Sequence, residues 1–446
     1  MTKQRQLWLK IATIIGLILV LQIPLIWVDS AMSERQYYHT QAAENIAQSW
    51  SHRQVVTGPI LVVPYETQYK ENVWDKNLEA YVTRIRTRQN TKILVPEKNL
   101  INSDVSVERR YRGIYSAPVY TSQIDIEGHL DLTPIGAIKK EEGFVKIGQP
   151  SLVTFISDLR GVSEIPVLHY NDKELPFNAG TPIRTGQQGL HVDLTLDVLT
   201  SLDYEFSIKL KGSNALSFYP VGDNNTVNLV SAWPHPKFNG KFLPDTREIR
   251  DNGFSVSWSL NSLSSNLNEI IQACERGNCE ELLNTYFGVE FIEPISAYSL
   301  SDRAGKYALL FLLLTFAAFF LFEVFKSLLI HPLQYLMVGL SLSIFYLLLV
   351  AFSEHMSFTL AYWGSALACI GLIGFYSSYV LCGATRAITL SSALLLIYTL
   401  MFFILRSEDY AFVMGAILLF AILTAVMVIT RKFNWYRLGE VVPKQG

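Results

Sequence analysis

Residues 7–28 read LWLKIATIIGLILVLQIPLIWV, an apolar stretch in which Lys10 is the one charged residue. Since lipid offers no partner to an unpaired peptide group, a bilayer core of about 30 Å is crossed by about 20 residues in a helix. The stretch therefore predicts a membrane anchor over residues 1–28. A cleaved signal peptide ending near Ser30 is the alternative, but the stretch exceeds the usual apolar core of about 7–15 residues and no small-x-small site follows it.

Hydrophobic residues are concentrated at the two ends of the 446-residue chain and raise its mean hydropathy to +0.23. Soluble proteins rarely reach a positive mean, so the composition indicates a membrane protein. We predict an α+β membrane protein with six transmembrane helices, one N-terminal and five C-terminal. The five C-terminal stretches, of which the first is short unless it extends past Glu323, are 307–322, 333–352, 358–381, 387–405 and 410–430.

Lysine and arginine indicate the orientation of these helices, because cytoplasmic loops are enriched in both. Basic residues flank both ends of the chain, whereas the short loop 353–355 carries an acid. The pattern predicts that both termini are cytoplasmic and that the segment after the first helix lies on the opposite side of the membrane. The flanking basic residues are Lys3, Arg5, Lys10, Arg431, Lys432 and Arg437.

The inserted segment, residues 29–305, contains no spanning stretch and reads as a large extracytoplasmic domain. Residues 33–52 carry apolar side chains at helical intervals and are expected to continue the first helix as a stalk. Beyond them the period changes to two, so we predict an antiparallel β-rich fold, a sheet or a sandwich in one domain or two, closed by a helix near 262–286. The expected strands are 60–63, 81–88, 122–132, 191–198, 204–210, 226–230 and 254–258. A transmembrane bundle over 306–432 and a cytoplasmic tail over 433–446 follow.

Four cysteines are too few for a disulfide scaffold. Cys369 and Cys382 lie in or beside apolar stretches, where a cysteine is usually a small buried hydrophobe. Cys274 and Cys279 bracket a polar loop, and outside the cytoplasm either a short-range disulfide or two thiols would fit the sequence. With no second Cys or His pair nearby, we predict no zinc site.

Motifs spread over nearly the whole chain share their order and spacing with one known family. They are GPI (58–60), GIY (113–115), DLRG (158–161), WPHP (233–236), FLP (242–244), Arg247, GF (253–254), DRAGKY (302–307), TFAAFFLFE (315–323), HPLQYLMVGL (331–340), FYLLL (345–349) and SEH (353–355). In these motifs the chain resembles the CreD family, although Gly305 departs from the bulkier residue, often threonine, that the family pattern has there. The resemblance implies a bacterial inner-membrane protein with a periplasmic domain. It also implies a role in cell-envelope integrity, envelope stress, colicin tolerance and the β-lactam response, with expression under a sensor kinase and response regulator, but no established molecular activity.

The chain offers no recognisable catalytic constellation. No ionisable residue lies at mid-depth of the six predicted spans, which argues against a proton-driven carrier. Metalloprotease, nucleophile-elbow, Walker-type and dinucleotide-binding motifs are missing from the sequence. We therefore predict a protein that is not an enzyme, with no catalytic residues, no metal and no cofactor.

Asp302, Arg303 and Lys306 form a charged collar where the domain is expected to enter the membrane. We interpret this collar as an interfacial anchor in which Asp302 caps the N-terminus of a helix and opposes its dipole. The functional alternative is a hinge that couples the domain to the bundle.

Three further motifs are candidates for interaction. Trp233 and His235 stand among prolines that forbid regular sheet pairing, so a rigid turn or sheet edge is expected, with an exposed aromatic surface as the alternative. His331 precedes a helix-opening proline, where capping is expected and pH sensing or a cytoplasmic partner is the alternative. Glu354 and His355 could act as acid and base or hold a metal, but no third ligand stands at a recognisable spacing.

The leading hypothesis is a non-enzymatic envelope protein whose exported domain binds an unidentified envelope protein, lipid or glycan, besides contacting the lipid bilayer. A transporter of a lipid or envelope precursor is the second hypothesis and predicts an apolar groove in the domain. An envelope hydrolase built on Glu354, His355 or His235 is the third. A net charge of −2 gives no reason to expect nucleic acid. The sequence leaves open the oligomeric state and the choice between sensing, scaffolding and transport.

Overall fold

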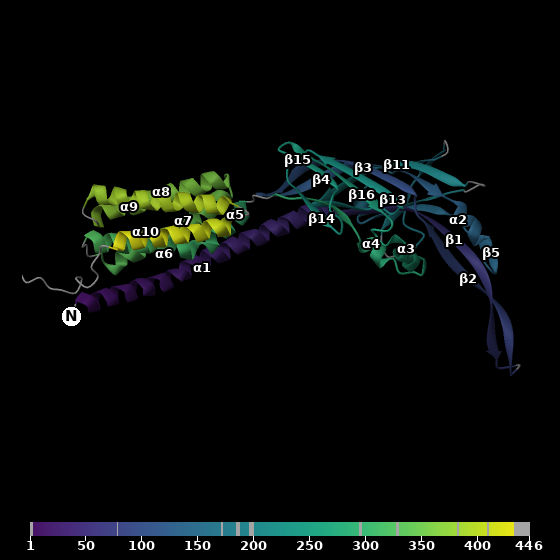
Figure 1. Ribbon diagram of the computed structural model, residues 1–446, viewed down its shortest axis with the longest axis horizontal. Helices are drawn as coiled ribbons and strands as arrows, with labels where there is room; N and C mark the ends of the chain where they lie inside the picture. Colours follow the sequence, from purple (N-terminus) through teal and green to yellow (C-terminus); the bar gives the residue numbers. More distant parts are fainter. Residues whose placement is uncertain are drawn as a thin grey trace, which may run out of the picture. The chain divides into compact units, whose positions relative to one another are not determined.

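The computed structural model describes residues 3–77, 79–170, 173–183, 188–195, 200–293, 297–326, 330–380, 383–407 and 410–431 (Figure 1). The chain divides into a β-rich unit, Gln41–Pro294, and a helical unit made of Met1–Thr40 and Ile295–Gly446. Helix α1 (Lys3–Trp50) runs without interruption from the helical unit into the β-rich unit. The predicted stalk, 33–52, lies in this helix as far as Trp50, and the predicted tail, 433–446, lies outside the described residues.

The β-rich unit contains two sheets, and both are antiparallel except for the pairs β1–β12 and β3–β13. The two parallel pairs aside, the predicted antiparallel β-rich fold is confirmed. Sheet A consists of β1 (Gln54–Asp75), β2 (Ala80–Leu94), β5 (Phe144–Ile147), β6 (Ser151–Ile156), β9 (Asn178–Ala179), β10 (Gly189–Asp193), β12 (Ala215–Tyr219), β14 (Pro236–Gly240) and β17 (Phe287–Phe291). Sheet B has the order β15-β16-β13-β3-β4-β11-β7-β8. Its bounds are β3 (Lys98–Arg112), β4 (Tyr115–Asp131), β7 (Val167–Tyr170), β8 (Lys173–Pro176), β11 (Ser201–Ser213), β13 (Asn224–Ser231), β15 (Thr246–Arg250) and β16 (Gly253–Asn261).

A continuous apolar core lies between the sheets, because alternate residues of each strand point inward. Sheet A is buried on its other face as well, where α3 (Leu267–Glu275) and α4 (Glu280–Asn284) cover it. The helix expected near 262–286 is thus two short helices, separated at Gly277 in a left-handed conformation (φ +95°). Two short helices, α2 (Thr133–Ile138) and η1 (Leu159–Gly161), complete the unit. The expected strand 191–198 ends early, at Asp193, and residues 196–199 lie outside the described part of the chain.

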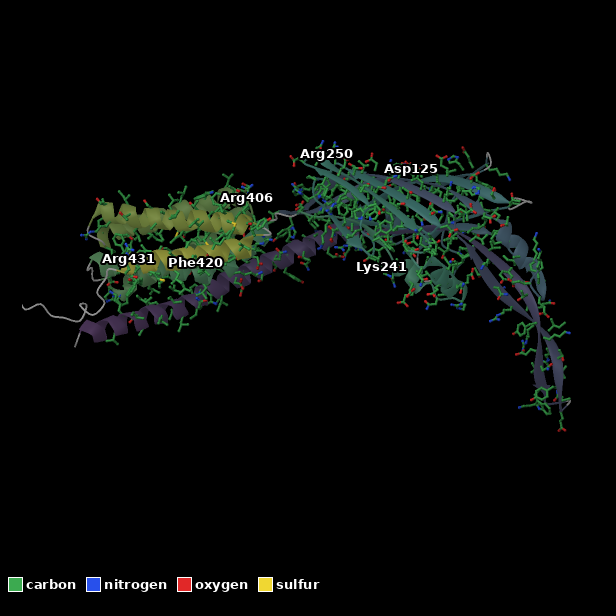
Figure 2. All side chains as sticks on the ribbon, viewed as in Figure 1. Asp125, Lys241, Arg250, Arg406, Phe420 and Arg431 are labelled. Atoms are coloured by element: carbon green, nitrogen blue, oxygen red, sulfur yellow. A yellow bond between two sulfur atoms is a disulfide. The ribbon has the colours of Figure 1, made fainter. Side chains whose placement is uncertain are left out.

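The outer face of sheet B is polar over most of its width. On strands β3, β4, β11 and β13 most inward-facing residues are apolar and most outward-facing residues are polar, although Val230 is an exposed apolar residue. Asn228 donates a hydrogen bond to Asn102 across the sheet (2.9 Å), and Ser207 donates one to Asp125 (2.6 Å; Asp125 is labelled in Figure 2). The last turns of α1 cover one end of this face, where Ile46 packs against Ala117 and Val119 of β4. The remainder of the face, around Glu127 and Glu205, is exposed in the described chain and can meet a ligand.

The end of α1 is anchored on the β-rich unit by aromatic and charged contacts. The Trp50 ring lies under the Arg110 guanidinium (4.7 Å) and the Lys211 ammonium (5.0 Å), and its indole N–H donates to a carbonyl of β4. Ser51 directly follows the helix, and its hydroxyl donates a hydrogen bond to the buried carboxylate of Asp158. The same carboxylate accepts a hydrogen bond from Arg160 (2.7 Å). The Arg160 guanidinium, together with the other donors, holds the pKa of Asp158 well below its usual range despite the opposing effect of burial.

The helical unit contains α5 (Ala297–Lys306), α6 (Ala308–Lys326), α7 (Pro332–Ser353), α8 (Phe358–Val380), α9 (Ala384–Arg406) and α10 (Ala411–Thr430), together with the first part of α1. Each of the six predicted spans falls on one of these helices. By length and apolarity, four helices of the described chain can cross a membrane, and α5 with α6 makes a fifth if this pair, bent by 51°, forms one span. The apolar part of α10, Val413–Val428, is shorter.

The β-rich unit is narrower than the predicted domain of 29–305. Residues 29–40 belong to the helical unit because Met32 is buried in the bundle core and Arg35 pairs with Glu354 (3.1 Å). At the other boundary, Leu300 and Ala304 of α5 are buried in the same core. Both segments are polar in composition, so their sequence does not indicate that they pack in the bundle.

Candidate functional site

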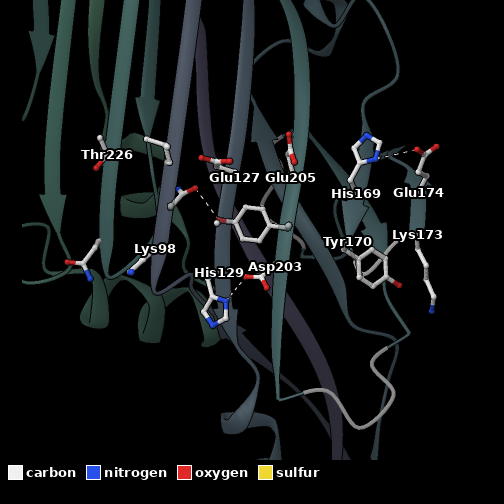
Figure 3. Close-up of a pocket in the computed structure, with 15 residues that line it drawn as sticks. Lys98, Glu127, His129, His169, Tyr170, Lys173, Glu174, Asp203, Glu205 and Thr226 are labelled. Carbon is white, nitrogen blue, oxygen red and sulfur yellow. Dashed lines mark hydrogen bonds and ion pairs between the residues drawn. The ribbon is translucent and has the colours of Figure 1, made fainter.

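A pocket of about 1050 Å³ opens on the polar outer face of sheet B (Figure 3). Strands β3, β4 and β11 form its floor, β13 borders it on one side, and β7 and β8 border it on the other. The lining is partly apolar, because Leu100 in the floor and Tyr170 at the β7 border contribute to it. The rim is charged, with acidic, basic and histidine side chains from strands that are distant in the sequence.

A buried polar contact fixes the strands beneath the pocket. The Tyr204 hydroxyl donates to the side-chain carbonyl of Asn99 (3.1 Å), and burial raises the pKa of Tyr204 above its ordinary value. Tyr204 lies across Gly128 of the neighbouring strand, where an added Cβ would collide with its hydroxyl and with the Lys98 carbonyl. Glycine at this position therefore lets β3, β4 and β11 lie closely together under the site.

The electrostatics of the rim are unbalanced. Two acids have histidine partners, His129 with Asp203 (2.6 Å) and His169 with Glu174 (3.5 Å). Glu127 and Glu205 lie directly opposite each other on β4 and β11, and within the described ranges no cation lies at ion-pair distance from either.

Like charges directly opposite in a sheet are destabilising, so a ligand that places a cationic group between these carboxylates would relieve their repulsion. The pocket can therefore bind an ammonium, a guanidinium or a group with several hydrogen-bond donors.

The helical unit contains a second charged cluster. Glu323, which is 5% exposed, pairs with Lys10 of α1 and accepts hydrogen bonds from the Tyr335 hydroxyl (2.8 Å) and the Ile330 backbone N–H (3.1 Å). Lys10 also donates to the Ile330 carbonyl (3.0 Å). The cluster joins α1 to the end of α6 and the start of α7. In the sequence Lys10 reads as a flanking charge, and the signal that could have indicated this pair is an acid and a base within apolar stretches.

Similarity to known proteins identifies the family. The family model for inner membrane protein CreD matches residues 6–436. The chain belongs to the CreD family. Inner membrane protein CreD of Escherichia coli (strain K12) is 33% identical to it over 438 residues, which cover 98% of this chain and 95% of that protein. CreD membership and the apolar helices together identify a multi-pass inner-membrane protein.

Similarity to solved structures is remote. An M1 zinc metallopeptidase from Deinococcus radiodurans matches 38% of this chain and 39% of its own, with 9% identity and a TM-score of 0.18. This likeness is too low to carry an argument. Within the described ranges, no group of three or more His, Cys, Asp or Glu side chains could hold a metal ion.

The WPHP motif of the CreD resemblance links the two sheets. It follows β13 of sheet B and ends where Pro236 opens β14, the edge strand of sheet A. The Trp233 indole donates to the Ile292 carbonyl (3.0 Å), and the His235 carbonyl accepts from the Ile292 N–H (3.3 Å). Both residues therefore lie in a turn that is hydrogen-bonded to the end of β17. This position suits a rigid turn better than an exposed aromatic surface.

The HPLQY and SEH motifs of the CreD resemblance lie at the two ends of α7. The His331 side chain accepts from the Leu333 N–H (3.2 Å) and Gln334 reciprocates, so His331 caps the helix as expected. At the C-terminal end, Glu354 pairs with Arg35, and the backbone N–H of His355 donates to a carbonyl of the last turn.

The first five residues of the motif DRAGKY lie in the second half of α5, Tyr307 follows the helix, and the expected N-cap role of Asp302 is wrong. The helix begins at Ala297, so Asp302 lies inside it and pairs with Lys306 one turn later (2.7 Å). Arg303 lies with Lys306 in the last turn of α5, and the chain bends after Lys306. Gly305, which departs from the family pattern, faces α1: an added Cβ would lie 3.2 Å from the Met32 sulfur. A bulkier residue there would press on α1.

Cys274 and Cys279 form a disulfide across the turn between α3 and α4, with their Cα atoms 4.1 Å apart. Both residues are buried in the cluster that covers sheet A. Cys369 is a free, buried cysteine of α8, and Cys382 lies outside the described residues.

Proposed function

We propose that this CreD-family protein supports cell-envelope integrity by non-enzymatic binding of an envelope component at the sheet B pocket. The observation that carries the proposal is the exposed, polar part of the outer face of sheet B, where Glu127 and Glu205 stand opposite each other without a cationic partner in the described chain. A component with an amine or guanidinium, or with many hydroxyl donors, matches this chemistry.

The proposal places six spans in the inner membrane, both termini in the cytoplasm and the β-rich unit in the periplasm. Basic residues at both chain ends support this orientation. The Cys274–Cys279 disulfide supports it independently, since disulfides persist in oxidising compartments such as the periplasm. A reporter fused near Gly180 should be active only outside the cytoplasm, and cytoplasmic activity would overturn the topology.

Binding is favoured over transport because the space between the sheets is filled by side chains such as Trp258 and Phe287, both fully buried. The transporter hypothesis expects an apolar groove there. Binding is favoured over hydrolysis because Glu354 is held by Arg35, and His235 lies in the turn that joins the sheets.

A photo-crosslinking residue placed at Thr226, inside the pocket, tests the proposal in intact cells. It should trap one specific envelope component, and Glu127→Gln/Glu205→Gln should reduce the yield at least about tenfold, which corresponds to about 1.4 kcal/mol. The matched control is Thr246, a threonine exposed on β15 at the edge of the same sheet. Equal labelling from both positions, or no specific adduct from Thr226, would contradict the proposal.

A further inference from the structure

Strands β1 and β2 continue beyond sheet A as a two-stranded ribbon (Figure 1). The last neighbour on the open side of β1 is β5, which pairs with residues 65–67. From there, the ladder between β1 and β2 runs on without a register shift to Asp75↔Ala80. This hairpin arm, defined here as residues 68–87, is about 26 Å long at roughly 3.3 Å per residue.

The arm exposes large aromatic and aliphatic side chains near its tip. Trp74 and Tyr81 are directly opposite each other, with ring centroids 5.1 Å apart, and are 50% and 71% exposed. Ile85, 67% exposed, lies on the same face of the ribbon. An isolated two-stranded ribbon is at best marginally stable in water, and tryptophan and tyrosine are enriched at the energetic centres of protein interfaces. The tip therefore has the composition of a docking surface.

The order of side chains along the arm favours a protein over a lipid bilayer as its partner. The charged residues Lys76 and Glu79 lie beyond the aromatic pair, at the very end of the hairpin. Insertion of the rings into hydrocarbon would carry these charges in ahead of them, at a large cost. Docking onto a protein surface leaves them at a polar rim.

The charge of the arm defines the surface that it fits. The arm, residues 68–87, has four basic and three acidic residues, a net charge of +1, and Arg88 follows it directly, so the partner should carry excess negative charge. The four basic residues are Lys70, Lys76, Arg84 and Arg86, of which Arg86 pairs with Glu71 (3.0 Å).

The sheet B pocket complements the arm in charge and in apolar surface. Four acids line it against two lysines, and Glu127 and Glu205 lack cationic partners in the described residues. Its volume of about 1050 Å³ suffices for a drug-sized ligand, and its floor is partly apolar. An aromatic pair flanked by basic residues would fill the floor and neutralise the rim.

The arm and the pocket that meet must belong to different molecules. Within one chain the arm is a direct continuation of sheet A, held by the uninterrupted ladder from Leu61↔Leu94 onward. The pocket lies on the outer face of sheet B. Folding the tip back onto sheet B would require breaking that ladder.

We infer that the hairpin arm of one chain docks in the sheet B pocket of a second copy. The inference rests on the proposed function and names the component that the pocket binds. Because the two contacting surfaces differ, the interface is heterologous, and repetition gives a closed ring or an open chain of copies in the membrane plane.

The test uses the full chain in intact cells, with two differently tagged copies. A photo-crosslinking phenylalanine analogue replaces Tyr81 in one copy, and irradiation should give an adduct of two chains whose cross-linked peptide maps to β3, β4 or β11. Tyr111, 70% exposed at the end of β3, is the matched control position and should give no such adduct. Introducing Glu127→Lys/Glu205→Lys in the other copy should lower the adduct yield at least about tenfold. Glu248→Lys, on exposed β15, should leave the yield unchanged.

An adduct between Tyr81 and lipid, or a different protein, would overturn the inference, as would a two-chain adduct insensitive to the pocket charges. These results are separable from the proposed function. If the pocket position Thr226 still captures one specific component while Tyr81 fails to reach a second copy, the binding function stands and self-association falls.

Discussion

The cluster around Glu323 allows a quantitative test of how α1 is held in the helical unit. Glu323 is almost fully buried, and its two oxygens accept hydrogen bonds from Tyr335 and Ile330 as well as pairing with Lys10. Removing one partner of a buried pair leaves the other charge uncompensated and costs roughly 3–5 kcal/mol. We expect about 3 kcal/mol for Lys10→Met and for Glu323→Leu, because the lysine side chain keeps some contact with solvent.

The double variant Lys10→Met/Glu323→Leu measures the interaction between the two side chains separately from the cost of burying one unpaired charge. Replacing both charges with apolar side chains is often neutral for a buried pair, so the double variant should cost less than the sum of the single changes by at least about 2 kcal/mol. The exposed pair Asp302–Lys306 is the matched control in the same unit. Its removal should cost at most about 0.5 kcal/mol.

Thiol labelling of Cys369 provides the assay, because this free cysteine is buried in α8 and reacts only when the bundle opens. The rate of labelling is followed along a denaturant series in detergent micelles, in a Cys382→Ser background, and gives the free energy of opening. The reasoning would be refuted if the double variant lost as much free energy of opening as the two single variants together. It would also be refuted if Cys369 were labelled at the same rate in the single variants as in the parent. Either result would mean that the pair does not fix α1 to α6 and α7.

Three further predictions concern other contacts. Asp158→Asn should cost about 1–3 kcal/mol at neutral pH. Because the native pKa of Asp158 is depressed, its stabilisation is complete above about pH 4 and is lost as the pH falls further, so urea unfolding of the parent should weaken more steeply below pH 4 than that of the variant. Gly339→Ala should cost about 1–3 kcal/mol, because its Cβ would collide with a leucine of α1, whereas Gly371→Ala, with open space around it, should melt within about 1 °C of the parent. Cys274→Ser/Cys279→Ser should lower the free energy of unfolding by about 2 kcal/mol, the value for a very short loop, and reductant should then have no further effect.

The sequence predicted those elements whose pattern is local. Strands β4 and β11 were foreseen because one of their faces is buried and the other exposed, which imposes a strict alternation. The outer half of β1 was missed because residues 68–75 are exposed and do not alternate in sequence, whereas their partners in 81–88, equally exposed, alternate and were predicted as a strand. The apolar period of α1 was equally local and predicted the stalk.

The candidate site could not be predicted in the same way. Glu127 and Glu205 are far apart in the sequence and meet only because β4 pairs with β11 in one particular register. A slip of β11 by one residue would turn Glu205 into the core and separate the two carboxylates. The pair Lys10–Glu323 spans even more of the chain, so its existence depends on how α1 packs on α6, and no periodicity encodes that.

Within the helical unit, the course of α1 sets both a rotational phase and a spacing between two ion pairs. Lys10 pairs with Glu323, and twenty-five residues later Arg35 pairs with Glu354. Each residue turns a helix by about 100° and advances it by about 1.5 Å, so the two side chains lie close to seven full turns apart, on nearly the same face. Inserting two residues between them would rotate one pair by about 200° relative to the other, and inserting seven would restore the facing but move one pair about 10 Å along the axis. The length of α1 between these two pairs is therefore a specified property of the protein.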